Sequence, residues 1–260
     1  MHFSRESLIH SGKQVDRRTK VLEFRDNEAT KYAILSHWWT DPTEVDYEEM
    51  IDLDKMDRQE GDEIRSRLGY QKLVDTCKQT KQDGYERVWI ELAVSTSEAA
   101  PSFLRPLIRC RNSQVRYAYP HDFDGSSFPI KKDNVKYPKS NGWPEWFSRG
   151  WTLQEMIAPR DLQFFNKDWQ PIGDKKTLAQ TLQLITQVPE HMLADGLEGN
   201  CPCVAQIISW AANRTTTRVE DGVLSLLDVN MPMLYGERKK AFHRLRLEII
   251  RSSDDQSIFA

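Results

Sequence analysis

Trp151 and Glu155 are the residues whose types and spacing first suggest chemistry. Four positions apart on a helix, they share one face and lie about one turn from each other. An indole beside a carboxylate can raise the pKa of the acid, or provide a flat surface next to a negative charge. Gly150 permits a tight turn into the helix, and Pro159 ends it. The spacing predicts a short helix with one acid on its aromatic face. A surface helix with a packed Trp and a solvated Glu remains the alternative.

The segments around this helix alternate between apolar runs typical of strands and stripes typical of helices. Strands are expected at residues 32–36, 87–92, 115–119 and 161–166. The acidic stretch from 41 to 63 is expected to be a solvated loop or an exposed helix, and a helix containing Pro106 is expected at 101–112. Alternating strands and helices predict an α/β fold with a mainly parallel sheet flanked by helices.

The pattern divides the chain into an extension and one domain. Residues 1–30 are expected to be an N-terminal extension, and residues 31–260 a domain whose α/β body reaches to about residue 174. From 175 to 260, helical stripes follow one another, which predicts a helical C-terminal part.

Composition excludes several classes of protein. A chain of 260 residues with 39% hydrophobic and 29% charged residues is typical of a soluble globular protein. A net charge of −3 gives no general attraction to nucleic acid or anionic membranes. No apolar run approaches the roughly 18 residues of a membrane span, and no signal peptide is visible. We therefore expect a cytoplasmic protein with no membrane span and no nucleic-acid partner.

The cysteines do not indicate a metal site. Cys201 and Cys203 are too closely spaced for a usual half of a zinc site, and no neighbouring Cys or His pair completes one. The four thiols of the chain are typical of reduced cysteines in a cytosolic protein.

Eight tracts in order resemble the fungal heterokaryon-incompatibility (HET) domain family. They include the helix above, within Arg149–Glu155, and they cover most of residues 30–260. The tracts are Tyr32–Trp39, Val88–Ile90, Tyr117–Tyr119, Arg149–Glu155, Ser209–Arg214, Thr217–Asp221, Asn230–Glu237 and Ser253–Phe259.

The resemblance implies a role in programmed cell death after non-self recognition. HET domains look distantly similar to TIR domains, which have a flavodoxin-like core, and some TIR domains cleave NAD with a glutamate in a Trp-x-x-x-Glu setting. The resemblance thus implies Glu155 as the catalytic residue and NAD as substrate rather than as a bound cofactor. The substrate-binding residues that it implies are Ser36, His37, Trp38, Glu91, Arg149 and Trp151.

Physical chemistry makes such a site reasonable. Cleaving the bond between nicotinamide and ribose builds positive charge on the ribose, which a carboxylate can stabilise. Ser36 and His37 end the first expected strand of the domain, where ligands of open α/β sheets collect. Arg149 could meet a phosphate. The alternatives are that Ser36 and His37 close a turn and that Arg149 pairs with an acid.

The second tract departs from the family pattern. Glu91 stands where family members commonly have Asp, and Thr96 replaces a second acid. Thr40 replaces a usual Gly, and the segments 96–117 and 221–228 look shorter than usual. An error of about 1 Å in the position of a catalytic group can cost roughly 100-fold in rate. Two alternatives to an enzyme therefore stay open. One is a non-catalytic signalling module that forms homo-oligomers or binds partner signalling domains, and the other is a degenerate, inactive copy.

Overall fold

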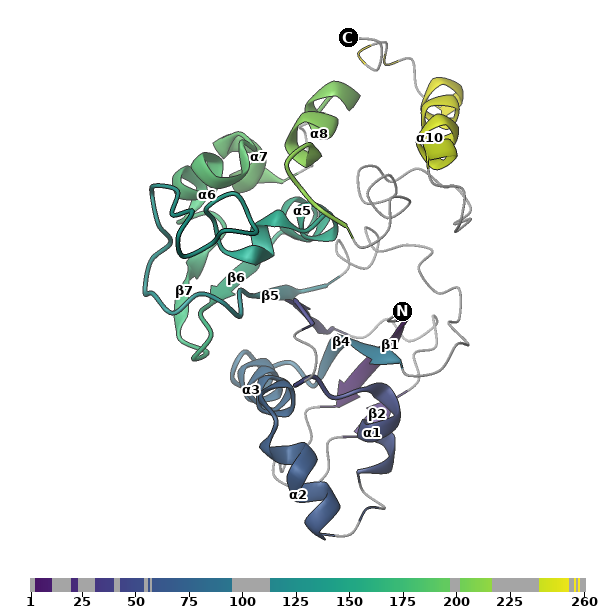
Figure 1. The fold of residues 1–260 in the computed structure, drawn as a ribbon, viewed down its shortest axis with the longest axis vertical. Coiled ribbons are helices and arrows are strands. Elements are labelled where there is room, and N and C mark those ends of the chain that lie inside the picture. Colours follow the sequence, from purple (N-terminus) through teal and green to yellow (C-terminus); the bar gives the residue numbers. More distant parts are fainter. Residues whose placement is uncertain are drawn as a thin grey trace. The chain divides into compact units, whose positions relative to one another are not determined.

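The computed structural model describes residues 3–10, 20–22, 31–39, 43–53, 56, 58–94, 113–196, 202–216, 239–252, 255 and 257. The chain forms two compact units (Figure 1). The first unit combines Met1–Phe103 with Ser113–Tyr119, and the second combines Leu104–Asn112 with Pro120–Ala260. Each unit is described separately below.

The first unit is built on a mixed sheet. In order across the sheet, its strands are β2 (Lys20–Leu22), β1 (Phe3–His10), β4 (Arg87–Val94), β3 (Ala33–His37) and β5 (Val115–Tyr119). β3 runs parallel to both β4 and β5, whereas β1 is antiparallel to β2 and β4. Four of the five residues of β3 and of β5 are buried, as expected for strands covered on both faces.

The predicted α/β fold is confirmed, and its three parallel strands lie where the apolar runs placed them. β1 and β2 were not predicted, because residues 1–30 show no clear alternation of apolar and polar positions. β1 pairs with β4 along its whole length, from Phe3 opposite Val94 to His10 opposite Arg87.

Helices α1 (Tyr47–Asp52), α2 (Arg58–Ser66) and α3 (Leu68–Gln82) complete the described part of the first unit. α1 begins with a capping box. The Glu49 amide donates to the Asp46 carboxylate at 2.7 Å, and the Asp46 amide donates to the Glu49 carboxylate at 3.1 Å. The acidic stretch therefore contains α1, which a local cap starts, and the beginning of α2. α3 buries Leu73, Thr76, Cys77 and Thr80, which share one helical face.

The second unit has a short hairpin and several helices. Its elements are η1 (Glu145–Ser148), α5 (Trp151–Ile157), β6 (Leu162–Phe165), β7 (Pro171–Asp174), α6 (Ala179–Thr186), α7 (Glu190–Asp195), α8 (Val204–Ala211) and α10 (Lys239–Ser252). β6 and β7 pair antiparallel. The predicted helical C-terminal part is present.

Aromatic rings form the core of the second unit. The Phe164 ring meets Phe128 edge-on at 5.2 Å and Trp146 edge-on at 5.5 Å between ring centroids. Trp146 is fully buried, and Phe147 packs against it at 5.2 Å. Edge-to-face pairs of this kind add about 0.5–1.5 kcal/mol each beyond the area they bury. This cluster gives η1, which leads into α5, a rigid support.

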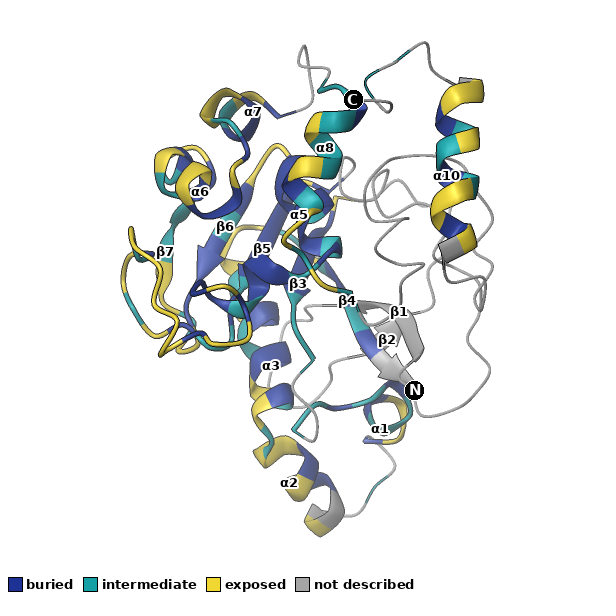
Figure 2. Ribbon diagram, turned by 45° about the horizontal axis from the view of Figure 1, so that its top comes forward, coloured by how far each residue is buried: buried dark blue, intermediate teal, exposed yellow. Residues whose placement is uncertain are grey.

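α8 and α10 pack through a second apolar cluster. Ala241, Leu245 and Ile249 lie one turn apart along α10 and are buried together with Val204 of α8. Figure 2 shows the consequence, with buried and exposed residues alternating along α10 while α5 is buried along most of its length. Among the described residues, no helix has the length and apolar character needed to cross a membrane.

Candidate functional site

α5 leaves only Trp151 and Glu155 partly exposed. The other five residues of the helix, Thr152–Gln154, Met156 and Ile157, are buried, none of them more than 6% exposed. The predicted helix is confirmed, and the two side chains that spacing placed on one face are those that reach the surface. An acid and an indole thus share the partly exposed face of α5, whereas the rest of the helix serves packing.

The start of α5 is fixed by a segment far along the chain. Residues Arg149 and Thr215 form a parallel β-bridge. The Gly150 amide donates to the Thr215 carbonyl at 3.0 Å, and the Thr215 amide donates to the Ser148 carbonyl at 2.6 Å. Gly150 itself has an ordinary right-handed helical backbone, with φ −59° and ψ −53°. The entry to α5 therefore uses no conformation that only glycine can adopt, and main-chain pairing orients the helix.

Arg214 adds a side-chain anchor at the same place. Its Nη1 donates to the Arg149 carbonyl at 2.9 Å and to Thr152 Oγ1 at 2.8 Å. The Thr152 hydroxyl in turn donates to the Trp146 carbonyl at 2.7 Å. Burial lowers the pKa of Arg214 to about 9, and the negative charge of Glu155 acts in the opposite direction. At neutral pH a buried positive charge therefore lies within electrostatic reach of the Glu155 carboxylate.

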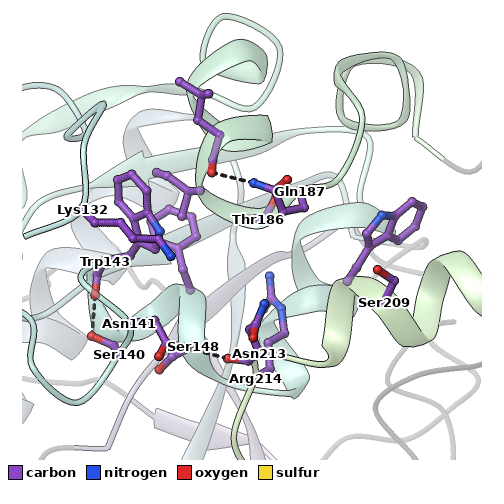
Figure 3. Close-up of a pocket in the computed structure, with 14 residues that line it drawn as sticks. Lys132, Ser140, Asn141, Trp143, Ser148, Thr186, Gln187, Ser209, Asn213 and Arg214 are labelled. Carbon is purple, nitrogen blue, oxygen red and sulfur yellow. Dashed lines mark hydrogen bonds between the residues drawn. The ribbon is translucent and has the colours of Figure 1, made fainter. Parts of the chain in front are cut away.

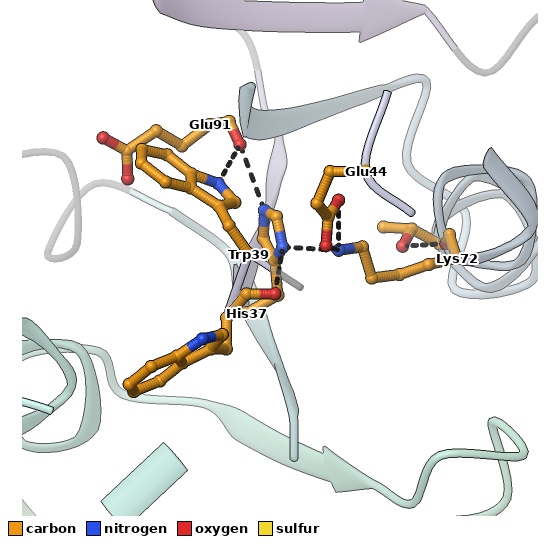
Figure 4. A network of polar contacts seen from close by, with 7 residues as sticks. His37, Trp39, Glu44, Lys72 and Glu91 are labelled. Carbon is orange, nitrogen blue, oxygen red and sulfur yellow. Dashed lines mark hydrogen bonds and ion pairs between the residues drawn. The ribbon is translucent and has the colours of Figure 1, made fainter. Parts of the chain in front are cut away.

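In the first unit, His37 lies in a half-buried polar network, of which Lys72 is the buried member (Figure 4). Lys72 of α3 places its Nζ 2.8 Å from His37 Nδ1, and 2.6 Å and 2.8 Å from the two carboxylate oxygens of Glu44. His37 Nε2 lies 3.1 Å from the main-chain oxygen of Glu91 in β4. The indole N–H of Trp39 donates to the same oxygen at 3.1 Å.

These contacts fix the state of the imidazole. Burial and the positive charge of Lys72 lower the pKa of His37 to about 3, so the ring is neutral at pH 7. An ammonium group can only donate, so Nδ1 accepts from Lys72 and Nε2–H donates to Glu91. Burial also lowers the pKa of Lys72, and the Glu44 carboxylate opposes that change. Both nitrogens of His37 are therefore engaged within the protein.

The remaining predicted residues of the first unit surround this network. Ser36 is buried in β3, and Trp38, just beyond the strand, is partly exposed. Glu91 is partly exposed, and Figure 4 shows its carboxylate turned away from His37. The fold thus gathers Ser36, His37, Trp38 and Glu91 in the first unit, and Arg149, Trp151 and Glu155 in the second. That both groups line one pocket stays a prediction.

The second unit contains a cavity of about 310 Å³ (Figure 3). Its lining comes from the loop 132–148, from α6 and from α8 with the turn that follows it. Lys132 and Arg214 are basic, Trp143 and Trp210 contribute indoles, and none of the described lining residues is Asp or Glu. The described part of the lining therefore carries two basic groups and no acid.

Sequence reasoning missed Lys72, Glu44 and Arg214. Arg214 ends the Ser209–Arg214 tract, which was noted only as part of the resemblance. The sequence thus marked its position but predicted no contact or function for its side chain. Nothing near Lys72 or Glu44 marks them as partners, because they are 28 residues apart and separated by two helices.

The chain is similar to part of a characterised fungal protein. It is 34% identical over 231 residues to the vegetative incompatibility protein HET-E-1 of Podospora anserina, a match that covers 84% of this chain and 16% of the relative. The chain thus corresponds to about one sixth of that protein's length. No protein-family model and no solved structure matches the chain.

Proposed function

We propose that this chain acts in vegetative incompatibility as the part that triggers cell death, and that it does so by hydrolysing NAD. The similarity to a vegetative incompatibility protein supports the biological role. The observation that carries the chemical proposal is the geometry of α5, whose partly exposed residues are Trp151 and Glu155.

Glu155 acts as the catalytic carboxylate. As the bond between ribose and nicotinamide breaks, nicotinamide leaves with the bonding electrons and positive charge grows on the ribose. The Glu155 carboxylate stabilises that charge, and a water molecule then adds to the ribose and loses a proton, giving ADP-ribose. Trp151, one turn earlier on the same face, provides a flat surface for a base.

The surroundings of Glu155 keep the helix rigid. Arg214 and Thr152 hold the first turn of α5, and the buried face of the helix prevents rotation. In this proposal His37 is a positioning residue rather than a ligand contact, because Lys72 and Glu91 already occupy its ring nitrogens. Ser36, Trp38, Glu91 and Arg149 remain proposed substrate-binding residues.

The test is to incubate the purified chain with NAD and to follow nicotinamide and ADP-ribose by chromatography. Glu155→Gln keeps the size of the side chain and removes its charge, so release should fall by about 100-fold or more. Glu190→Ala, which removes an exposed acid from α7 of the same unit, is the control and should leave the rate unchanged. No release by the unaltered chain at high concentration, including after forced oligomerisation, contradicts the NAD proposal. Cell killing that persists in Glu155→Gln would contradict the NAD proposal as well, independently of the chromatography.

Self-association without catalysis is the second candidate. α10 exposes Phe242, Leu247 and Ile250, which are 40%, 42% and 46% exposed, besides the stripe that it packs against α8. Exposed apolar side chains on one helix favour contact with another copy or another signalling domain. Light scattering at increasing concentration tests this function. A mass that grows in the unaltered chain and stays monomeric in Phe242→Ser supports it, and a strictly monomeric chain that still kills cells contradicts it.

A further inference from the structure

The cavity of the second unit contains more hydrogen-bond donors than its own residues satisfy. Trp143 and Trp210 are each 7% exposed and line the cavity, and within the described part of the chain neither indole N–H has a hydrogen-bond acceptor. Neither indole nitrogen is among the fully buried atoms that lack a partner. Both N–H groups are therefore open to water or to a ligand group that accepts hydrogen bonds.

The basic residues of the cavity also favour a ligand that accepts hydrogen bonds. Lys132 is exposed at its rim and has no ion-pair partner among the described residues. Arg214 is held through Nη1, while its buried Nη2 has no hydrogen-bond partner. No acid is among the described lining residues, so Lys132 acts on an occupant without a neighbouring negative charge in the lining, whereas Glu155 partly offsets the charge of Arg214 from outside the cavity. Donors and positive charge together favour an anion.

The backbone of the rim is also unusual. Asn141 and Gln187 line the cavity with positive φ values of 56° and 62°, which non-glycine residues adopt rarely. Such conformations gather at ligand sites, where the surroundings hold them in place. Figure 3 shows both side chains among the lining residues, Asn141 from a loop and Gln187 from the end of α6. Asn141 Nδ2 donates to the Asn213 carbonyl at 3.3 Å, and Gln187 Nε2 donates to the Leu184 carbonyl at 3.1 Å.

Size and shape narrow the class of ligand. Small-molecule sites span ~300–1,000 Å³, so a cavity of about 310 Å³ suits a mononucleotide better than a dinucleotide. Indole side chains can stack on a flat heterocycle, and Lys132 can meet a phosphate at the rim.

We propose that this cavity binds a nucleoside monophosphate, with the phosphate at Lys132 and the base against an indole of the lining. The site is distinct from Glu155, which does not line the cavity. It approaches α5 only through Arg214, whose Nη1 holds the start of that helix. The proposal goes beyond the NAD hydrolysis proposed above and does not depend on it.

Calorimetric titration of the whole chain with adenosine monophosphate tests the proposal, with inorganic phosphate and adenosine as separate arms. Adenosine monophosphate should bind saturably and more tightly than either fragment. Lys132→Met should weaken binding about tenfold, whereas Lys131→Met, which removes the neighbouring exposed lysine that does not line the cavity, should leave affinity unchanged.

A second variant tests the binding site separately from any effect that Lys132→Met has on folding. Asn213→Asp adds a negative charge at an exposed position on the cavity, so the folded variant should lose binding of adenosine monophosphate. Equal affinity in the unaltered chain, Lys132→Met and Asn213→Asp overturns the proposal, as does the absence of saturable binding at millimolar nucleotide. These titrations contain no NAD and need no turnover, so their failure leaves the role of Glu155 untouched.

Discussion

Arg214 Nη1 lies 2.8 Å from Thr152 Oγ1, although 62 residues separate them. Through this contact, the turn after α8 holds the first turn of the helix that carries Glu155. The same hydroxyl donates to the Trp146 carbonyl at 2.7 Å, so the anchor reaches into the aromatic core of the second unit. The orientation of Glu155 is thus set by buried residues that do not themselves need to touch a substrate.

Thr152→Val should lower the free energy of unfolding by about 1–3 kcal/mol, because it removes the hydrogen bond that Thr152 Oγ1 donates to the Trp146 carbonyl and the one that it accepts from Arg214 Nη1. Thr152→Ser retains the hydroxyl and should be markedly more stable than Thr152→Val. Urea denaturation of both variants measures the difference. Equal stability of the Val and Ser variants would show that the hydroxyl contributes nothing.

His37 should make stability depend on pH in the acid range. Its folded pKa is about 3 against an ordinary value of 6.5, so below pH 6.5 the unfolded chain binds a proton that the folded chain does not. The free energy of unfolding therefore falls as the pH drops from 6.5 towards 3, by up to about 1.4 kcal/mol per pH unit. The measurement is the difference in stability between the unaltered chain and His37→Gln at several pH values. That difference should shrink with falling pH, and two parallel curves would refute the assignment.

Lys175 should have the corresponding effect in the alkaline range. The side chain is 1% exposed, and its Nζ donates to the carbonyls of Ile157 and Pro159 at the end of α5. Burial lowers its pKa from 10.5 to about 8, so between pH 8 and 10.5 the unfolded chain binds more protons than the folded one. Stability from this group consequently rises over that window.

The check compares thermal unfolding of the unaltered chain with Lys175→Met from pH 7 to 10.5. The unaltered chain should gain stability relative to the variant above pH 8. Lys139→Met, which changes an exposed lysine, is the matched control and should show no such trend. A constant difference across the range would mean that Lys175 does not titrate there.

Gly142 and Gly84 provide a matched test of the cavity rim, since both have φ of +82°. A Cβ at Gly84 would meet nothing within 4 Å, so Gly84→Ala should cost only the backbone strain, about 1–2 kcal/mol. A Cβ at Gly142 would lie 2.7 Å from Asn134 Oδ1 and 2.9 Å from the Lys132 Cβ. Gly142→Ala should therefore destabilise more, as measured by urea denaturation. Equal costs would mean that the loop beside the cavity rearranges freely.

Local pattern was enough to locate several elements. The apolar runs located β3, β4 and β5, because a parallel strand buried on both faces is apolar almost throughout. The four-residue spacing placed Trp151 and Glu155 on one face of a helix, since helical periodicity is a local property. The sequence therefore predicted the α/β class and the most prominent candidate acid.

Contacts between residues far apart in the chain could not be predicted from the local pattern of apolar and polar residues. His37 was predicted to bind substrate, yet its partners Lys72 and Glu91 lie 35 and 54 residues away, and only folding brings them together. The strand β1 was not predicted because its own sequence has no clear strand pattern. Its extended conformation depends on pairing with β4.

What the sequence alone determined is which residue types share a strand or a helical face, because backbone geometry repeats every two or 3.6 residues. Tertiary structure decided which of those side chains form hydrogen bonds or ion pairs with distant parts of the chain and which reach the surface. It engaged both nitrogens of His37 and anchored Thr152 through Arg214. The physical reason is that a buried polar group must find its partner in space, at whatever distance along the chain.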